Sequence, residues 1–290
     1  MKGTVSYDRR SSLVIAPVSG APGRELTGLR VVFEVKKTSQ SHANTASVKV
    51  YNLRQDTRNA ILVKKAALIL KAGYSWSGAE LPVVASGVVL RVEHSAASPD
   101  VETSVDLRDG GLGLDDSKVR RAYPAGSIVG DVVKAIVATM PDVTLGTLDA
   151  EAMTRKFTSK RVLSGSSRVA LDGIATAYGF EWSVQDGVLQ ALDRTNAKGQ
   201  QYSAAVISAK TGMIGSPTKT DAGCKVDSLL LPFVLPGSFI KVESSFCSGY
   251  FKALTVEHKG DTHGDEWKTT IDAKSLDKWQ GPGKKSKGKK

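Results

Sequence analysis

Cysteine is scarce in this sequence, which has only Cys224 and Cys247 in 290 residues. Two cysteines cannot form the disulfide framework of a small secreted protein, and these two lack the C-x-x-C spacing of zinc or redox sites. A chain of this length can bury a sufficient apolar core without cross-links. We therefore expect two free thiols in a protein that is assembled in a reducing cytoplasm.

Long apolar runs are also missing. No stretch approaches the ~18–20 apolar residues that a membrane-spanning helix needs, and no apolar segment of a secretory signal follows Lys2. Hydrophobic residues make up 41% of the chain and charged residues 24%, which is ordinary for a globular protein. The sequence thus predicts a globular protein without a membrane partner.

Motifs for catalysis and for cofactor binding are absent. The serines within 164–167 do not form G-x-S-x-G, and the glycine-rich stretch 110–113 has neither a P-loop lysine nor a dinucleotide fingerprint after it. Asp115 and Asp116 are interpreted as solvated loop residues rather than as a glycosidase pair. Aromatic residues, at 6%, are not interleaved with basic residues on any strand, so no base-stacking surface is predicted. We expect no catalytic residue, no cofactor site and no cofactor, and therefore no enzyme.

One group of side chains could in principle bind a metal ion. It comprises His258, Asp261, His263, Asp265 and Glu266. These residues fall at the tip of a predicted hairpin, where polar side chains are expected because water is there. No other element supplies a convergent ligand, since His42 and His94 belong to a different β region. The favoured interpretation is a solvated loop without a metal.

The net charge of +11 is concentrated at the C-terminus. Five lysines lie in the last seven residues: Lys284, Lys285, Lys287, Lys289 and Lys290. Without them the charge balance falls to +6, so the remainder is only mildly basic. We expect residues 276–290 to be a disordered tail, because they offer little apolar surface to bury. Such a tail could simply aid solubility, or it could attract nucleic acid or acidic protein through counterion release.

Alternating polar and apolar residues predict β-structure in the first hundred residues. Val31, Phe33 and Val35, for example, share one face of a strand, and polar residues lie between them. The stretch 17–28 is rich in proline and glycine and is predicted to be a long loop. Strands are predicted at 4–7, 13–16, 29–36, 46–51, 66–74, 83–93 and 101–108, with a short helix at 56–63.

The pattern changes after Asp109. An apolar stripe over 128–140 predicts a helix, with Ser127 as its N-cap and Pro141 as its end. A second helix is predicted from about Ser166 to a left-handed glycine, Gly179.

A hairpin and a linker are predicted to follow these helices. Asp186-Gly187 favours a type I′ turn, so 180–185 and 188–192 are predicted to pair as a hairpin. Residues 196–200 form a polar linker. The last β region has strand character at 249–258, a polar turn at 259–264 and a period-two strand over 267–273.

Three stretches carry a resemblance to a known family. The C-terminal region contains GMIGSP, then SLLLPFVLPGSFIKVES, then GYFKALTVEHKGDTHGDEW. The N-terminal region contains LRVVFEVKK and NTASVKVYNLRQDTRNAI, and the middle contains LDGIATAYGFEWSVQDGVLQAL. Over residues 5–275 the chain resembles the baseplate central hub proteins of contractile-tailed bacteriophages, the hub or late-control-type tail protein family.

The resemblance implies a mainly β fold in which two tail-tube-like β-barrel blocks flank a small α+β module. The implied domains are an N-terminal barrel at 1–109, the module at 110–200, a C-terminal barrel at 201–275 and the lysine-rich tail at 276–290. In this family the two barrels of each subunit let a trimeric ring mimic six tube-like barrels. Residues 29–108 and 205–273 are the β blocks that could play these parts.

The implied function is structural. The chain would be a baseplate hub subunit in the virion tail, assembled in the host cytoplasm as a homotrimer that joins the tail tube to the central spike. Implied partners are the spike, the tube or tube-initiator protein, surrounding baseplate proteins, and the tape-measure protein and DNA inside the axial channel. Because dense positive charge would hold DNA phosphates, we expect the basic surplus to lie outside the channel.

Two alternatives remain at this point. One is a hub-associated enzyme that degrades peptidoglycan, although no extra domain is left to hold that activity. The other is a nucleic-acid-binding protein that acts through the lysine tail. Neither accounts for two β blocks around a central module.

Overall fold

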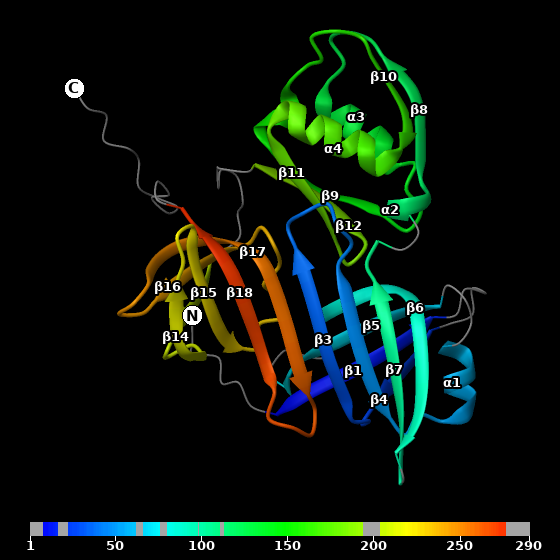
Figure 1. The fold of residues 1–290 in the computed structure, drawn as a ribbon, viewed down its shortest axis with the longest axis vertical. Helices are drawn as coiled ribbons and strands as arrows, with labels where there is room; N and C mark the ends of the chain where they lie inside the picture. The colour runs from blue at the N-terminus through cyan, green and yellow to red at the C-terminus, as the bar shows by residue number, and fades with distance from the viewer. Residues whose placement is uncertain are drawn as a thin grey trace.

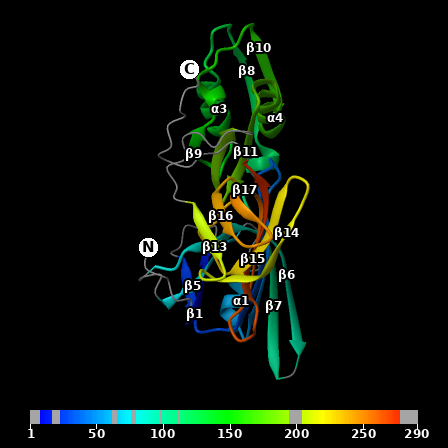
Figure 2. The same ribbon diagram turned by 90° about the vertical axis from the view of Figure 1, so that its left-hand side faces the viewer.

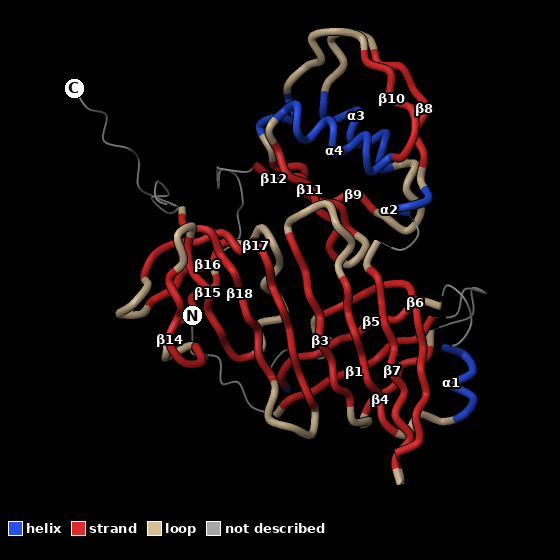
Figure 3. Tube along the Cα trace, in the orientation of Figure 1, coloured by secondary structure: helices blue, strands red, loops and turns tan. Residues whose placement is uncertain are grey.

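The computed structural model describes residues 8–16, 23–61, 66–75, 80–97, 99–110, 113–193 and 204–276. The predicted strand at 4–7, the linker at 196–200 and the lysine-rich tail from 277 onward lie outside these residues. Strands make up most of the structure, and all helices except α1 gather in a module at one end (Figures 1 and 3). The predicted fold class, mainly β with an α+β module, is confirmed.

Thirteen strands form one large sheet. Its N-terminal half contains β1 (Arg9–Ala16), β2 (Arg24–Thr27), β3 (Val31–Thr38), β4 (Thr45–Tyr51), β5 (Ala67–Tyr74), β6 (Val83–Ala97) and β7 (Asp100–Arg108), with helix α1 (Gln55–Ile61) beside them. Its C-terminal half contains β13 (Ala205–Ser208), β14 (Met213–Lys219), β15 (Gly223–Leu229), β16 (Phe239–Glu243), β17 (Ser248–Asp261) and β18 (Trp267–Ser275). The order is β14-β15-β18-β17-β3-β4-β7-β6-β5-β1-β2, and β16 pairs with both β17 and β13.

The two β blocks are halves of this single sheet. They join where β17 pairs antiparallel with β3, from Thr255 opposite Thr38 to Asp261 opposite Val32. Within the described residues the strand pairs do not close into a ring. Among the described residues the two β regions therefore form one continuous sheet and not the two closed barrels that the resemblance implied, because the β17–β3 ladder satisfies the backbone groups along the edge of each half.

The junction between the halves is tightly packed. Gly260 lies opposite Phe33 on one side and Trp267 on the other. The two aromatic rings meet edge to face with centroids 5.5 Å apart. A Cβ atom at Gly260 would come within 2.4 Å of the Phe33 ring and 2.8 Å of the Trp267 ring. The junction therefore requires glycine at this position.

Two sequence-based boundaries are wrong. The predicted loop 17–28 contains strand β2, whose backbone pairs with β1 and whose Leu26 packs against the core. The predicted polar turn at 259–264 begins too early, because β17 continues to Asp261 and leaves 262–266 as the turn. In both cases ladder hydrogen bonds to a neighbouring strand hold polar residues that look like a loop in sequence.

The α+β module is built in layers. Its elements are α2 (Gly113–Asp116), β8 (Lys118–Tyr123), α3 (Val129–Val137), β9 (Thr144–Asp149), a 3-10 turn (Glu151–Thr154), β10 (Arg161–Ser166), α4 (Ser167–Tyr178), β11 (Phe180–Gln185) and β12 (Val188–Asp193). Helices α3 and α4 lie between the β8–β10 ribbon and the β11-β12-β9 sheet (Figures 1 and 2). The apolar faces of both helices form the module's own core.

The helix and hairpin predictions largely hold in the module. Gly179 ends α4 with φ of 80°, and Asp186 and Gly187 both have positive φ, as a type I′ turn requires. Ser127 is not the N-cap of α3: that position is Ile128, and the Ser127 hydroxyl instead donates to the Pro124 carbonyl at 2.8 Å. Strands β8, β9 and β10 were not predicted.

Candidate assembly surface

The large sheet has one polar face that no described helix covers. Figure 1 views this face directly, with β1 and β5 crossing behind β3 and β4. The outward positions of β3, β4, β6, β7, β15, β17 and β18, together with Arg30 just before β3, carry nine solvent-accessible basic residues, namely Arg30, Lys36, Lys49, Arg91, Arg108, Lys225, Lys259, Lys268 and Lys274. They also carry nine acidic residues, namely Glu34, Glu93, Asp100, Glu102, Asp106, Asp227, Glu257, Asp261 and Asp272. This face is therefore electrically balanced.

Opposite charges on this face are paired, both between neighbouring strands and along a single strand. The Lys259 ammonium lies 3.1 Å from the Glu34 carboxylate and 2.9 Å from that of Glu257. Lys49 on β4 lies 2.9 Å from Glu102 on the neighbouring strand β7. Each exposed pair contributes little to stability. Together they leave few isolated charges on the face.

The pKa values of these paired groups are shifted by the hydrogen bonds to their partners. The hydrogen bond from Lys49 lowers the pKa of the Glu102 carboxyl, and that from Arg30 lowers the pKa of Asp261. The hydrogen bond to Glu257 raises the pKa of Lys259. All three shifts favour the charged forms, so the face keeps its balanced charges at neutral pH.

The sheet has unpaired edges on both sides of this face. Strand β14 pairs only with β15, and β6 pairs with β5 only from Val83 to Val88. In the described part of the chain, the outer edge of β14 and the edge of β6 beyond Val88 have no strand partner. Each edge carries an exposed aliphatic side chain: Leu90 on β6 is 57% exposed and Ile214 on β14 is 43% exposed. Unpaired edges with apolar side chains favour pairing with another chain.

A buried polar network holds the module against the end of the sheet. The Asn44 amide nitrogen lies 3.0 Å from Asp109 Oδ2, 2.8 Å from the Val184 carbonyl oxygen and 2.9 Å from Gln185 Oε1. The backbone N–H of Thr38 donates to Asn44 Oδ1 at 2.9 Å. Asn44 thus joins the β3–β4 loop to the β11–β12 hairpin of the module.

Asp109 completes this network. Its carboxylate accepts hydrogen bonds from the backbone N–H groups of Asp186 and Gly187, both at 2.7 Å. Burial, together with the nearby charge of Asp186, raises the pKa of Asp109. The three N–H donors act in the opposite direction and favour the carboxylate.

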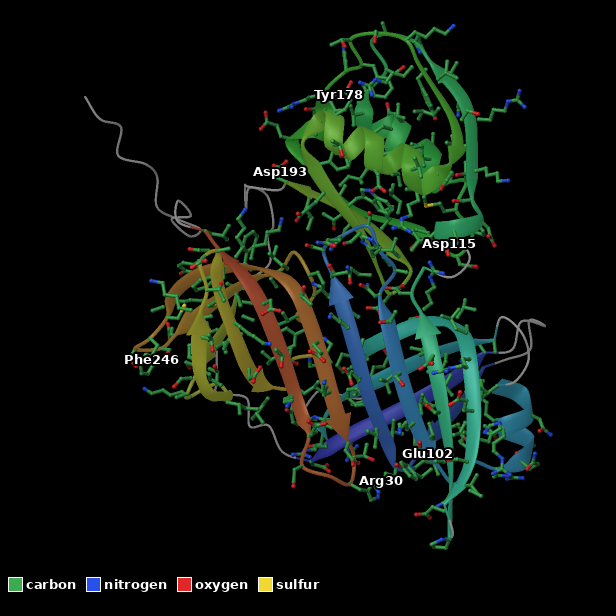
Figure 4. The ribbon with its side chains drawn as sticks, viewed as in Figure 1. Arg30, Glu102, Asp115, Tyr178, Asp193 and Phe246 are labelled. Carbon is green, nitrogen blue, oxygen red and sulfur yellow. The ribbon has the colours of Figure 1, made fainter. Side chains whose placement is uncertain are left out.

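Two buried lysines add ion pairs to the same contact. Lys37, 1% exposed, lies 2.5 Å from the Asp186 carboxylate. Lys252 pairs with Glu181 and donates to the Asp193 carbonyl at 2.8 Å. Both lysines come from the sheet and both acceptor sets come from the module, whose Asp193 is marked in Figure 4. The module is therefore fixed by charge as well as by packing.

The structure separates the candidate metal ligands. His258 is fully buried in β17, with Nδ1 2.9 Å from the Thr269 hydroxyl, and burial lowers its pKa to about 3. Asp261 lies on the opposite, outward face and pairs with Arg30 at 2.8 Å. His263 is exposed on the turn, where its Nδ1 lies 3.0 Å from the Thr262 hydroxyl.

The remaining two members of that group are also engaged elsewhere. Asp265 accepts from Arg9 through its backbone carbonyl, and Glu266 lies 3.4 Å from Lys268. Among the described residues no three side chains of the metal-binding types converge. The prediction that His258 sits at a hairpin tip is wrong, since it points into the core from within the strand.

The acidic, serine and glycine residues that the sequence analysis considered as possible catalytic or cofactor motifs lie in ordinary secondary structure or bond to neighbouring side chains. Asp115 lies 2.5 Å from Arg108 and 3.9 Å from Arg168. Ser164 and Ser166 lie on β10, and the Ser167 hydroxyl is 2.8 Å from that of Thr139. Gly110 has a positive φ of 73° at the entrance to the module.

No helix in the described part of the chain combines the length and apolar character needed to cross a membrane.

The polar network was missed by sequence reasoning, although one signal was present. Lys37 follows Val31, Phe33 and Val35 at the inward positions of β3, so alternation alone places its ammonium on the buried side. A buried lysine needs a carboxylate partner. Its partner, Asp186, is 149 residues away in sequence, so the pairing itself was not visible.

The described structure thus combines a mainly β fold, a balanced polar face with unpaired sheet edges, and a module held by buried ion pairs. The comparisons identify the class of protein, which is that of bacteriophage tail proteins. The chain belongs to the family described as Baseplate hub gp41, whose model matches residues 19–250. It is thus a structural component of the phage baseplate, in the virion tail. No curated protein sequence matches the chain.

Solved structures share the fold. The 43 kDa tail protein of prophage MuSo2 from Shewanella oneidensis superposes with a TM-score of 0.65 at 8% identity, covering 92% of this chain and 97% of that one. A tail protein from Neisseria meningitidis MC58 gives 0.60 at 14% identity, covering 93% and 97%. An E. coli component of the type VI secretion system, described as structurally similar to T4 bacteriophage tail proteins gp27 and gp5, gives 0.59 at 14% identity, covering 85% and 73%.

Proposed function

We propose that the chain is the non-enzymatic hub subunit of a contractile tail, forming a homotrimeric ring between the tail tube and the central spike. The ring encloses an axial channel for the tape-measure protein and DNA. The domains 1–109, 110–200 and 201–275 correspond to two tube-like blocks and the module between them. The observation that carries this proposal is the balanced polar sheet with an unpaired edge on each side.

The unpaired edges support a closed ring. Strand β14 of one copy can pair with the unpaired part of β6 in the next, which extends the polar face from copy to copy. Such a head-to-tail contact uses two different surfaces and closes into a ring when the rotation between copies divides a full turn. The family resemblance supplies the number three.

The ring predicts that each edge is needed for assembly. We expect Leu90→Asp or Ile214→Asp to weaken trimer formation by roughly a hundredfold or more, because each places an unpaired charge in the contact between copies. Mass photometry of the purified chain, with negative-stain electron microscopy of the parent rings, measures this. The matched control is Val169→Asp, which changes a side chain 68% exposed on α4, away from both edges. A monomeric parent chain, or loss of trimer only in the control, would contradict the ring.

The balanced face supports its assignment to the channel wall, because DNA would pass without being held by phosphate contacts. We expect the chain lacking residues 283–290 to show no DNA retention at about 0.15 M salt. Adding Glu34→Lys, Glu93→Lys and Asp272→Lys to it should create retention that weakens steeply with salt. Electrophoretic mobility shift at several salt concentrations measures both.

The control for that experiment exchanges Glu34→Lys with Lys36→Glu, which alters the face without changing its net charge. It should remain without DNA retention. Strong retention by the tail-deleted parent would contradict a channel face and would favour a nucleic-acid-binding protein instead.

A further inference from the structure

A two-stranded ribbon of the module carries positive charge that no described carboxylate neutralises. Strands β8 and β10 pair antiparallel, from Lys118 opposite Ser166 to Tyr123 opposite Arg161. Figure 1 shows this ribbon on the outer side of α3 and α4, opposite the β11-β12-β9 sheet. The ribbon and the chain next to it, residues 117–128 and 155–168, contain several basic residues and no acidic residue.

Six of these basic residues form no ion pair within the described part of the chain: Lys118, Arg120, Arg121, Lys156, Lys160 and Arg161. The ion pairs of this part of the module use other cations, since Arg155 lies 3.8 Å from Glu151 and Arg168 lies 3.9 Å from Asp115. The polar face of the large sheet is the opposite case, because both signs of charge are balanced there. Unneutralised like charges repel one another and together attract an anionic partner.

Aromatic rings hold two of these guanidinium groups in place without neutralising them. Arg121 lies over the Tyr123 ring, with Cζ 5.6 Å from the ring centroid. Arg161 lies over the rings of Phe157 and Tyr178, at 5.4 and 5.8 Å, and Figure 4 marks Tyr178. A guanidinium group on an aromatic face keeps N–H donors for a carboxylate. The ribbon is therefore preorganised for acidic groups that none of the described residues supplies.

The outer face of the ribbon combines charge with apolar surface. Lys118, Arg120 and Ala122 are exposed at alternate positions of β8. Val162 on β10 lies opposite Ala122 and is 67% exposed. A segment that fits this face therefore has acidic side chains beside the two cations and an apolar side chain beside Ala122 and Val162.

The strand edges of the ribbon favour a protein partner over a nucleic acid. In the described residues β8 pairs only with β10, and β10 only with β8. An unpaired edge presents both N–H donors and C=O acceptors, which a peptide strand matches. Phosphate oxygens only accept, so a nucleic acid cannot continue this ladder. The nearby rings of Tyr123 and Phe157 are buried and cannot stack on bases.

We propose that the β8–β10 ribbon is a docking site for an acidic, extended segment of a partner protein, which adds to the edge of β8 as a third strand. Carboxylates of that segment pair with Lys118, Arg120 and Arg121, and its backbone continues the β8 ladder. The site lies on the module and uses neither β14 nor β6. A partner can therefore bind here while those two edges contact neighbouring subunits.

A peptide probe tests this proposal on the full chain. The probe is a fluorescein-labelled peptide of about ten residues in which glutamate alternates with valine, and its counterpart has lysine in place of glutamate. Fluorescence anisotropy at about 0.15 M salt should show saturable binding of the acidic peptide only. Lys118→Glu together with Arg120→Glu should weaken this binding roughly tenfold or more. Lys118→Gln with Arg120→Gln should give a smaller loss in the same direction.

The matched control is Arg54→Glu with Arg58→Glu, at and next to helix α1, which changes the net charge by the same amount as the glutamate pair. It should bind the acidic peptide as the parent chain does. Hydrogen–deuterium exchange separates strand addition from attraction by charge alone. The bound peptide should slow exchange at the backbone amides of residues 118–123, which attraction to the lysine-rich tail would not do.

Three results would each overturn the proposal. The first is no binding of the acidic peptide up to about 1 mM. The second is equal binding by the parent chain and the Lys118→Glu, Arg120→Glu variant. The third is binding that leaves the amides of 118–123 unprotected. A DNA duplex of about 20 base pairs is tested alongside. Duplex binding that this variant loses, without acidic-peptide binding by the parent, would assign the ribbon to nucleic acid instead.

Discussion

Asn44→Ala should lower the free energy of unfolding by about 3–5 kcal/mol, because it leaves several buried polar groups without partners. The Asn44 amide is the donor for Asp109, Val184 and Gln185 and the acceptor for the Thr38 N–H. Each buried group that loses its only strong partner costs about 1–3 kcal/mol. Urea denaturation followed by circular dichroism measures the change.

The matched control is Asn59→Ala on α1, where the side chain is exposed and, among the described residues, accepts a hydrogen bond from Gln55. It should change stability by less than about 0.5 kcal/mol. Hydrogen exchange locates the effect: in Asn44→Ala the faster exchange should concentrate at the Asp186 and Gly187 N–H groups that bind Asp109. Equal losses in the two variants would show that the network does not hold the module.

Acidification from pH 7 to pH 4 should destabilise the protein by about 3 kcal/mol through His258 alone. Burial lowers the pKa of His258 to about 3 in the folded chain, from 6.5. Below pH 6.5 the unfolded chain therefore binds a proton that the folded chain excludes. The contribution is fully present above pH 6.5 and is lost as pH falls toward 3, at up to about 1.4 kcal/mol per unit.

His258→Gln should remove this part of the pH dependence while it lowers stability at pH 7. Urea midpoints measured at half-unit steps from pH 7 to 4 provide the comparison. If the parent and His258→Gln profiles run parallel, His258 does not stay neutral in the folded core.

The elements of this fold were predictable where the signal is local. The period-two pattern of Val31, Phe33 and Val35 needs no partner to be recognised. Gly179 and the Asp186-Gly187 turn were also predictable, because glycine and aspartate are residue types that favour the positive φ found at these positions.

Elements with weak local signals escaped prediction. Strand β10 reads RVLSGS, in which Gly165 and two serines hide the alternation, and it becomes a strand only because β8 pairs with it. The β17–β3 junction is a non-local pairing of the same kind.

Only the charge of the candidate surface was predictable from the sequence, and not the residues that form it. The expectation that positive charge would not dominate the channel wall came from how phosphates bind lysine, and the proposed wall has a balance of both signs. Which residues form that face could not be read from the sequence, because it depends on the order of strands from both ends of the chain. His258 shows the reverse error: a polar residue near a turn was placed in solvent, whereas the register of β17 directs it inward.

The β17–β3 junction also determines when the molecule can become complete during synthesis. Thr38 leaves the ribosome more than two hundred residues before its partner Thr255. The module at 113–193 contains all the strands it pairs with, so it can fold while the chain is still growing. One edge of strand β3 stays unpaired until β17 has been synthesised, because its other edge pairs with β4. The interval between the synthesis of β3 and the synthesis of β17 is therefore the period in which this chain is most exposed to mispairing and most dependent on chaperones.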